Sequence, residues 1–103
     1  MKEELKQIIE HYGVMPQLKY FQSEVFELNE AILEYRYDEN KYYPEVEKCL
    51  IKHIAEEIAD VTVMLKQFQY HYGIEDKEIE EVMKFKIERQ LERIKNEANN
   101  DRN

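Results

Sequence analysis

Glycine and proline, the two residues that most strongly break helices, occur only twice each in this 103-residue chain. The rest is rich in Glu, Lys, Ile and Leu, a composition that is typical of long helices. Gly13 is suited to end a first helix over residues 2–12. Pro16 is suited to the first turn of a second helix over residues 16–37. The breakers therefore predict an all-α fold.

The second half of the chain is divided in the same way. Pro44 can open a third helix, which extends to Tyr72 and stops at Gly73. Asp76 is a candidate cap for a fourth helix. Because only residues 38–43 join the second and third helices, we expect these two helices to be antiparallel neighbours.

The second and third helices each carry a row of apolar residues at alternating spacings of three and four, which is a heptad seam. The seam positions are Leu18, Phe21, Val25, Leu28, Ile32 and Tyr35 in the second helix, and Ile54, Ile58, Val61, Leu65, Phe68 and Tyr72 in the third. Two seams in one chain do not enclose a full bundle, and a domain this small has a marginal core. We therefore predict an antiparallel helical bundle completed by dimerisation into a four-helix core, as a homodimer or as a homotetramer of such dimers.

The length allows one domain, which we place over residues 1–97, followed by a frayed tail over residues 98–103. No segment approaches the roughly 20 apolar residues that a membrane span needs, and the N-terminus is unlike a signal peptide. The formal net charge of −8 argues against a nucleic-acid partner. We therefore expect a cytoplasmic protein with no membrane or nucleic-acid partner.

Two pairs of acidic residues recur at the same spacing on neighbouring helices. Glu24 and Glu27 lie on the second helix, and Glu57 and Asp60 on the third. Each pair is i, i+3, so its members share one helix face. In both heptads the first member takes position g and the second position c, on the same side of the seam. Because g faces g in an antiparallel pair, we expect the four carboxylates to converge between the two helices.

Such a convergence is unfavourable for the helices alone. Positions beside a seam usually pair opposite charges, whereas like charges next to an apolar core are costly to ionise. A divalent cation removes the conflict, and Mg²⁺ prefers oxygen ligands while keeping several waters. The pattern thus predicts a Mg²⁺ site, for which Mn²⁺ is a possible substitute, with open positions that a triphosphate can occupy.

These motifs resemble those of the MazG-like all-alpha nucleoside triphosphate pyrophosphohydrolases, which carry ExxE on one helix and EExxD on the next. The stretch QLKYFQSEVFELNEAI is similar to the family's first motif, and HIAEEIADVTVML to its second. The resemblance covers roughly residues 12–95. One departure is Ser23, where many members have a further Glu, and this leaves the number of bound metals open.

The resemblance implies hydrolysis of a nucleoside or deoxynucleoside triphosphate between the α and β phosphates, yielding a nucleoside monophosphate and pyrophosphate. It assigns Mg²⁺ to the four carboxylates, with a Glu of the first motif, Glu24 or Glu27, activating the attacking water. Lys86 and Arg89 on the fourth helix would meet phosphate oxygens. Gln17 would contact the substrate.

A second interpretation is a non-catalytic helical interaction or adaptor module. It explains the heptad seams equally well, but it does not explain the flank of like charges. A di-iron carboxylate bundle fits less well, because its Glu-x-x-His motif is absent: His53 precedes Glu56, which is the reverse order.

Overall fold

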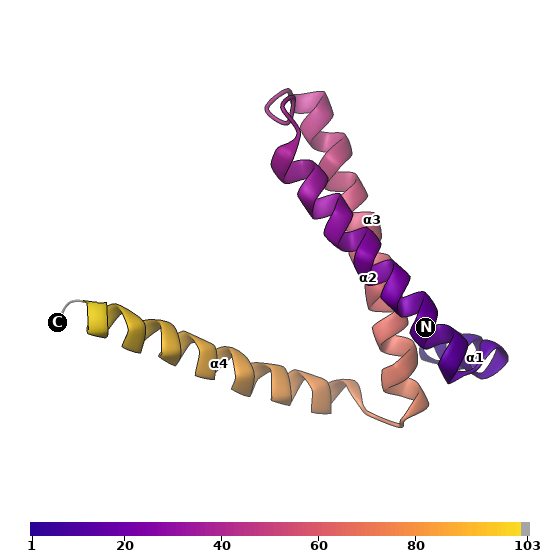
Figure 1. The fold of residues 1–103 in the computed structure, drawn as a ribbon. Coiled ribbons are helices and arrows are strands. Elements are labelled where there is room, and N and C mark those ends of the chain that lie inside the picture. Colours follow the sequence, from indigo (N-terminus) through magenta and orange to yellow (C-terminus); the bar gives the residue numbers. More distant parts are fainter. Residues whose placement is uncertain (102–103) are drawn as a thin grey trace. The chain divides into compact units, whose positions relative to one another are not determined.

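A computed structural model describes residues 1–101 of the chain, and in this part it contains four helices and no strand. The helices are α1 (Lys2–Tyr12), α2 (Val14–Tyr37), α3 (Pro44–His71) and α4 (Asp76–Asp101) (Figure 1). The predicted all-α class is confirmed. None of the helices in the described part combines the length and the apolar character needed to span a membrane.

The helices belong to two compact units, one over Met1–Tyr72 and the other beginning at Gly73. The first unit holds α1, α2 and α3, and the second holds α4.

The helix boundaries follow from the expected breakers. Gly13 has a φ of 90°, a conformation that favours glycine, and its N–H donates a 2.8 Å hydrogen bond to the carbonyl of Ile9. This residue ends α1 and lets α2 begin at Val14, slightly before the predicted start at Pro16. Pro16 is thereby placed in the first turn, where its missing N–H costs no helical hydrogen bond. Pro44 is the first residue of α3.

The connection between α2 and α3 is held by two side chains. The Asp38 carboxylate accepts a 2.7 Å hydrogen bond from the Asn40 N–H, as in an Asx turn. The Lys41 ammonium donates a 2.8 Å hydrogen bond to the carbonyl of Arg36 in the last turn of α2. The chain therefore reverses tightly, and α2 and α3 run antiparallel side by side, as predicted (Figure 1).

The core of the first unit is small. Helix α1 packs against both α2 and α3 and buries Ile9, which is only 1% exposed. Ala31 of α2 and Met64 of α3 are similarly enclosed, at 1% and 2% exposure. A few such side chains, each worth about 1.5–3 kcal/mol when fully buried, give this unit little stability in reserve.

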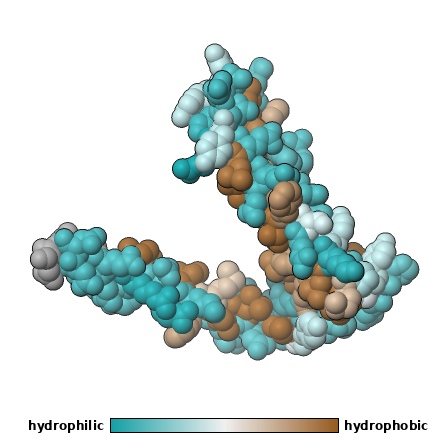
Figure 2. Space-filling view, viewed as in Figure 1, coloured by the Kyte–Doolittle hydropathy of each residue, from teal (hydrophilic) through white to brown (hydrophobic). Residues whose placement is uncertain are grey.

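The two heptad seams lie beside the contact between α2 and α3, and they remain partly open. Phe21 and Phe68 meet edge to face at 5.8 Å, but other seam residues are far from enclosed. Leu18 is 37% exposed, Ile58 49% and Leu65 52%. Figure 2 shows apolar residues interrupting the polar surface along this pair of helices. The seams therefore form an apolar face that the first unit does not cover.

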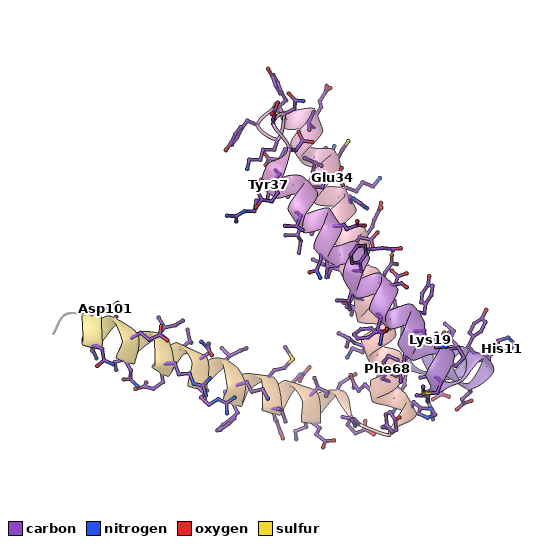
Figure 3. All side chains as sticks on the ribbon, in the orientation of Figure 1. His11, Lys19, Glu34, Tyr37, Phe68 and Asp101 are labelled. Atoms are coloured by element: carbon purple, nitrogen blue, oxygen red, sulfur yellow. The ribbon has the colours of Figure 1, made fainter. Side chains whose placement is uncertain are left out.

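Helix α4 has no buried residue in its described length, and its side chains project on all sides (Figure 3). Most of its apolar side chains are exposed, among them Ile87 at 55% and Leu91 at 60%, and Ile79 is intermediate. The helix continues beyond Glu97 to Asp101, into the segment that we expected to fray. Residues 102–103 of that expected tail lie outside the described residues.

Candidate metal centre and adjoining pocket

Three carboxylates meet between α2 and α3. Glu24 comes from α2, while Glu57 and Asp60 come from consecutive turns of α3. One oxygen of each lies within 4.8 Å of an oxygen of the others, a spacing that a single cation could bridge. Three of the four predicted metal ligands are therefore brought together.

The burial of this cluster is uneven. Glu24 is 5% exposed, and the side chain of Glu57 is 12% exposed, whereas Asp60 opens to solvent. Glu24 Oε2 and Glu57 Oε2 are buried and have no hydrogen-bond partner among the described residues. Two buried carboxylate oxygens without partners are costly to the fold. A cation bound by these oxygens would remove that cost. Because Asp60 is exposed, a cation at this position would also be accessible to a ligand from solvent.

The electrostatics of Glu24 reflect this crowding. Burial raises the pKa of its carboxyl group above the ordinary value of 4.5, and a hydrogen bond from the Tyr20 hydroxyl opposes part of the rise. The negative charges of Glu27 and Asp60 raise the pKa further. The same Glu24 carboxylate raises the pKa of Tyr20, which keeps this phenol protonated and able to donate. Without a cation, the Glu24 carboxyl group therefore resists ionisation.

Glu27, the fourth predicted ligand, is exposed and does not join the three carboxylates that meet. It lies one turn beyond Glu24 and borders a shallow depression on the surface of α2, beside Gln22 and Phe26. Its negative charge still raises the pKa of Glu24. Its predicted role stays a prediction.

His53 joins the cluster from the solvent side. Its Nε2 lies 3.4 Å from Glu57 Oε1, and its Nδ1 lies 3.6 Å from Glu34 Oε2 on α2. A carboxylate ligand held by an outer group is typical of metal centres. Glu34 was not predicted from the sequence, because its contact depends on the register between α2 and α3.

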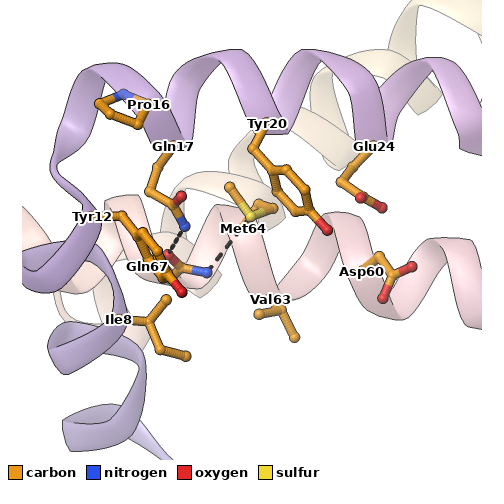
Figure 4. A pocket seen from close by; sticks show the side chains of 10 residues that line it. All are labelled: Ile8, Tyr12, Pro16, Gln17, Tyr20, Glu24, Asp60, Val63, Met64 and Gln67. Carbon is orange, nitrogen blue, oxygen red and sulfur yellow. Dashed lines mark hydrogen bonds between the residues drawn. The ribbon is translucent and has the colours of Figure 1, made fainter.

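A cavity of about 620 Å³ adjoins the carboxylates, between α1, α2 and α3 (Figure 4). Its walls are mostly apolar and aromatic. They are formed by Ile8, Tyr12, Pro16, Gln17, Tyr20, Glu24, Asp60, Val63, Met64 and Gln67. Glu24 and Asp60 stand at one end of this cavity, and Gln17 and Gln67 stand at the other (Figure 4).

The two glutamines form a buried pair. Gln17 Nε2 donates a 2.8 Å hydrogen bond to Gln67 Oε1, and Gln67 Nε2 donates to the Met64 sulfur at 3.6 Å. Gln17 was predicted to contact substrate, whereas Gln67 was not. The sequence could have indicated Gln67 through its helical spacing from Asp60, because that spacing places both side chains on one face of α3.

The predicted phosphate contacts, Lys86 and Arg89, lie on α4 in the second unit. The Arg89 guanidinium lies over the ring of Phe85, 5.8 Å from its centroid. Their predicted role therefore stays a prediction.

Comparison of the chain with protein-family models, curated proteins and solved structures finds no match.

The raised pKa of Glu24 predicts a pH dependence of stability in the absence of metal. Between the ordinary and the raised pKa, the native state binds more protons than the unfolded chain, so the free energy of unfolding falls as pH rises. The destabilisation by the ionised Glu24 carboxylate is fully present above the raised pKa. We expect the melting temperature in chelator to drop across this window, and Glu24→Gln to flatten the drop and raise the melting temperature near neutral pH.

Glu27→Gln is the matched control, because Glu27 is exposed on the same helix. It should reduce the drop only slightly, through its charge. Identical pH profiles for the wild type and Glu24→Gln would contradict an energetically costly Glu24.

Proposed function

We propose that this chain is a Mg²⁺-dependent nucleoside triphosphate pyrophosphohydrolase of the MazG-like, all-alpha kind. The observation that carries the proposal is the pair of buried, unpartnered oxygens on Glu24 and Glu57, which meet Asp60 beside a cavity. In a purely structural helix pair, such a cluster would only reduce stability. A metal-binding site beside a ligand pocket accounts for both features.

The donor set suits Mg²⁺ better than softer metals, because it consists of carboxylate oxygens with no thiolate. When bound, Mg²⁺ would neutralise phosphate oxygens and stabilise the charge on the departing pyrophosphate. Mn²⁺ takes the same ligands and could substitute. His53, which is not among the residues that line the cavity, would orient Glu57.

The proposed reaction is hydrolysis between the α and β phosphates. A water oxygen forms a new bond to phosphorus, the anhydride bond breaks, and pyrophosphate leaves the nucleoside monophosphate. We assign the orientation and deprotonation of that water to a glutamate of the first motif, Glu24 or Glu27.

A triphosphate also needs positive charge beyond the metal. The cavity walls contain no Lys or Arg among the described residues. We therefore propose that Lys86 and Arg89, which lie i, i+3 on α4 and share one face, supply it. Arg offers a bidentate fork to phosphate and Lys offers a point charge.

The uncovered apolar face supports a homodimer. Leu18, Ile58 and Leu65 lie on it, and they are between 37% and 52% exposed in the single chain. A second copy that presents the same face would bury both sets of seams in a four-helix core. Pairing of two such dimers would give a tetramer.

The first test is an assay with a panel of nucleoside and deoxynucleoside triphosphates and Mg²⁺, in which pyrophosphate and orthophosphate are both measured. We expect pyrophosphate release that falls by about a hundredfold or more in Glu57→Gln and in Asp60→Asn, because each variant loses a metal ligand. Glu56→Gln, an exposed neighbour of Glu57, should retain activity.

The same variants separate the enzyme from an adaptor module. Mg²⁺ should raise the melting temperature of the wild type and of Glu56→Gln, but not that of Asp60→Asn. A well-folded wild type that turns over no triphosphate would instead support the adaptor interpretation.

The role of the α4 cations is tested by Lys86→Ala and Arg89→Ala. We expect each to raise KM by about tenfold or more, because a charge-assisted hydrogen bond to phosphate is lost. Lys95→Ala, on the same helix, should leave KM within about twofold. Unchanged KM in both site variants would remove them from the proposed site.

The proposed dimer is tested by light scattering after gel filtration. Ile58→Glu and Leu65→Glu place charges on the apolar face, and we expect both to shift the protein toward a monomer. Lys52→Glu, at an exposed position of α3 outside the seam, is the control. A wild-type monomer at micromolar concentration would refute the dimer.

A further inference from the structure

The cavity beside the carboxylates is chemically different at its two ends. Glu24 and Asp60 form an anionic end, and the buried amides of Gln17 and Gln67 form a neutral, hydrogen-bonding end. Tyr20 and other largely apolar side chains line the space between them (Figure 4). A ligand that fills this cavity should therefore have a charged end that a metal can reach, a middle with apolar faces, and a far edge with hydrogen-bonding groups.

The spacing of the two ends is set by helix geometry. Gln17 lies seven residues before Glu24 on α2, and Gln67 lies seven residues after Asp60 on α3. Seven residues are about two turns, or about 10 Å along a helix. Because α2 and α3 are antiparallel, both displacements run in the same direction. The two amides therefore lie together, and their distance from the carboxylates is comparable to the length of a nucleoside.

The amide pair joins two helices and has hydrogen-bonding groups beyond those that link the two side chains. Gln67 is 2% exposed and Gln17 is 8% exposed, so both were taken out of water on folding. Each amide has two donor hydrogens and one acceptor oxygen, but only one 2.8 Å bond links the two. A second hydrogen bond of Gln67 goes to the thioether of Met64, which is a weak acceptor. Stronger hydrogen-bonding groups on a ligand would replace it.

We propose that Gln17 and Gln67 read the hydrogen-bonding edge of the substrate's nucleobase and set the base preference of the enzyme. The inference rests on the proposed function and extends it from the triphosphate to the base. The Tyr20 ring and the apolar walls would contact the base or the sugar, and the amide pair would receive an edge that carries a donor and an acceptor side by side. The hydrogen bond between the two glutamines fixes which groups face the ligand.

The test compares Gln17→Leu and Gln67→Leu with the wild type in the triphosphate panel. We expect kcat/KM for the preferred base to fall by about tenfold or more, and the preference between bases to shrink, since a buried amide then loses its partner. The stabilisation by Mg²⁺ should stay at its wild-type value, because neither glutamine touches the cluster. Gln22→Leu, on α2 outside this cavity, should keep the wild-type preference.

Base preference is the decisive measurement, because a merely structural pair would change stability and turnover without changing the ratio between bases. A ratio that is unaltered in both variants, with hydrolysis intact, would overturn the inference and leave the proposed function standing.

Binding without catalysis gives the converse test. Nucleoside monophosphates are titrated into the full chain without Mg²⁺ while the side-chain amide resonances of Gln17 and Gln67 are followed by NMR. Shifts that differ between bases would support the base pocket even if no triphosphate were hydrolysed. No shift with any base would count against it.

Discussion

The contact between α2 and α3 contains an interaction that the described side chains leave incomplete. Glu24 and Glu57 face each other across the contact between α2 and α3, and each keeps a buried oxygen without a partner. Helix packing gains little from this arrangement, because the core around it is small and like charges oppose ionisation. A folded chain that keeps such a cluster is under electrostatic strain, which a bound cation would relieve. If a cation binds there, stability and metal binding would be coupled through the same two side chains.

The helical period then divides each of the two long helices into separate surfaces. On α2, Gln17 and Glu24 point toward the cavity, whereas Leu18 stands one residue away on the uncovered apolar face. On α3, Asp60 lines the cavity, and Ile58, two residues earlier, lies on the apolar face. A rotation of either helix by one residue would move a carboxylate toward the apolar face and an aliphatic side chain toward the cavity. The pairing that creates the site therefore also exposes the surface proposed for a second copy.

The sequence predicted those features that depend on one helix at a time. Breakers such as Gly13 and Pro44 marked the elements, and the i, i+3 spacing marked the carboxylates, because both signals are local. Features that arise between helices were less accessible. The contact of His53 with Glu34 and the pairing of Gln17 with Gln67 depend on the register of α2 against α3, which the short connection constrains without specifying.

The acidity of the chain, with a formal net charge of −8, is consistent with a phosphate-bearing ligand only if positive charge is concentrated where it is needed. The cavity walls have no cationic side chain among the described residues, so a ligand bound there would be distinguished by its shape and hydrogen bonding. Recognition of phosphate and recognition of the remainder of the ligand are then separate tasks, about two helical turns apart. Under the proposed function, Glu24 and Asp60 would serve the first task through a metal, and the glutamine pair would serve the second. Such a separation would allow the glutamine pair to change in evolution while the carboxylates, and with them the chemistry, stayed constant.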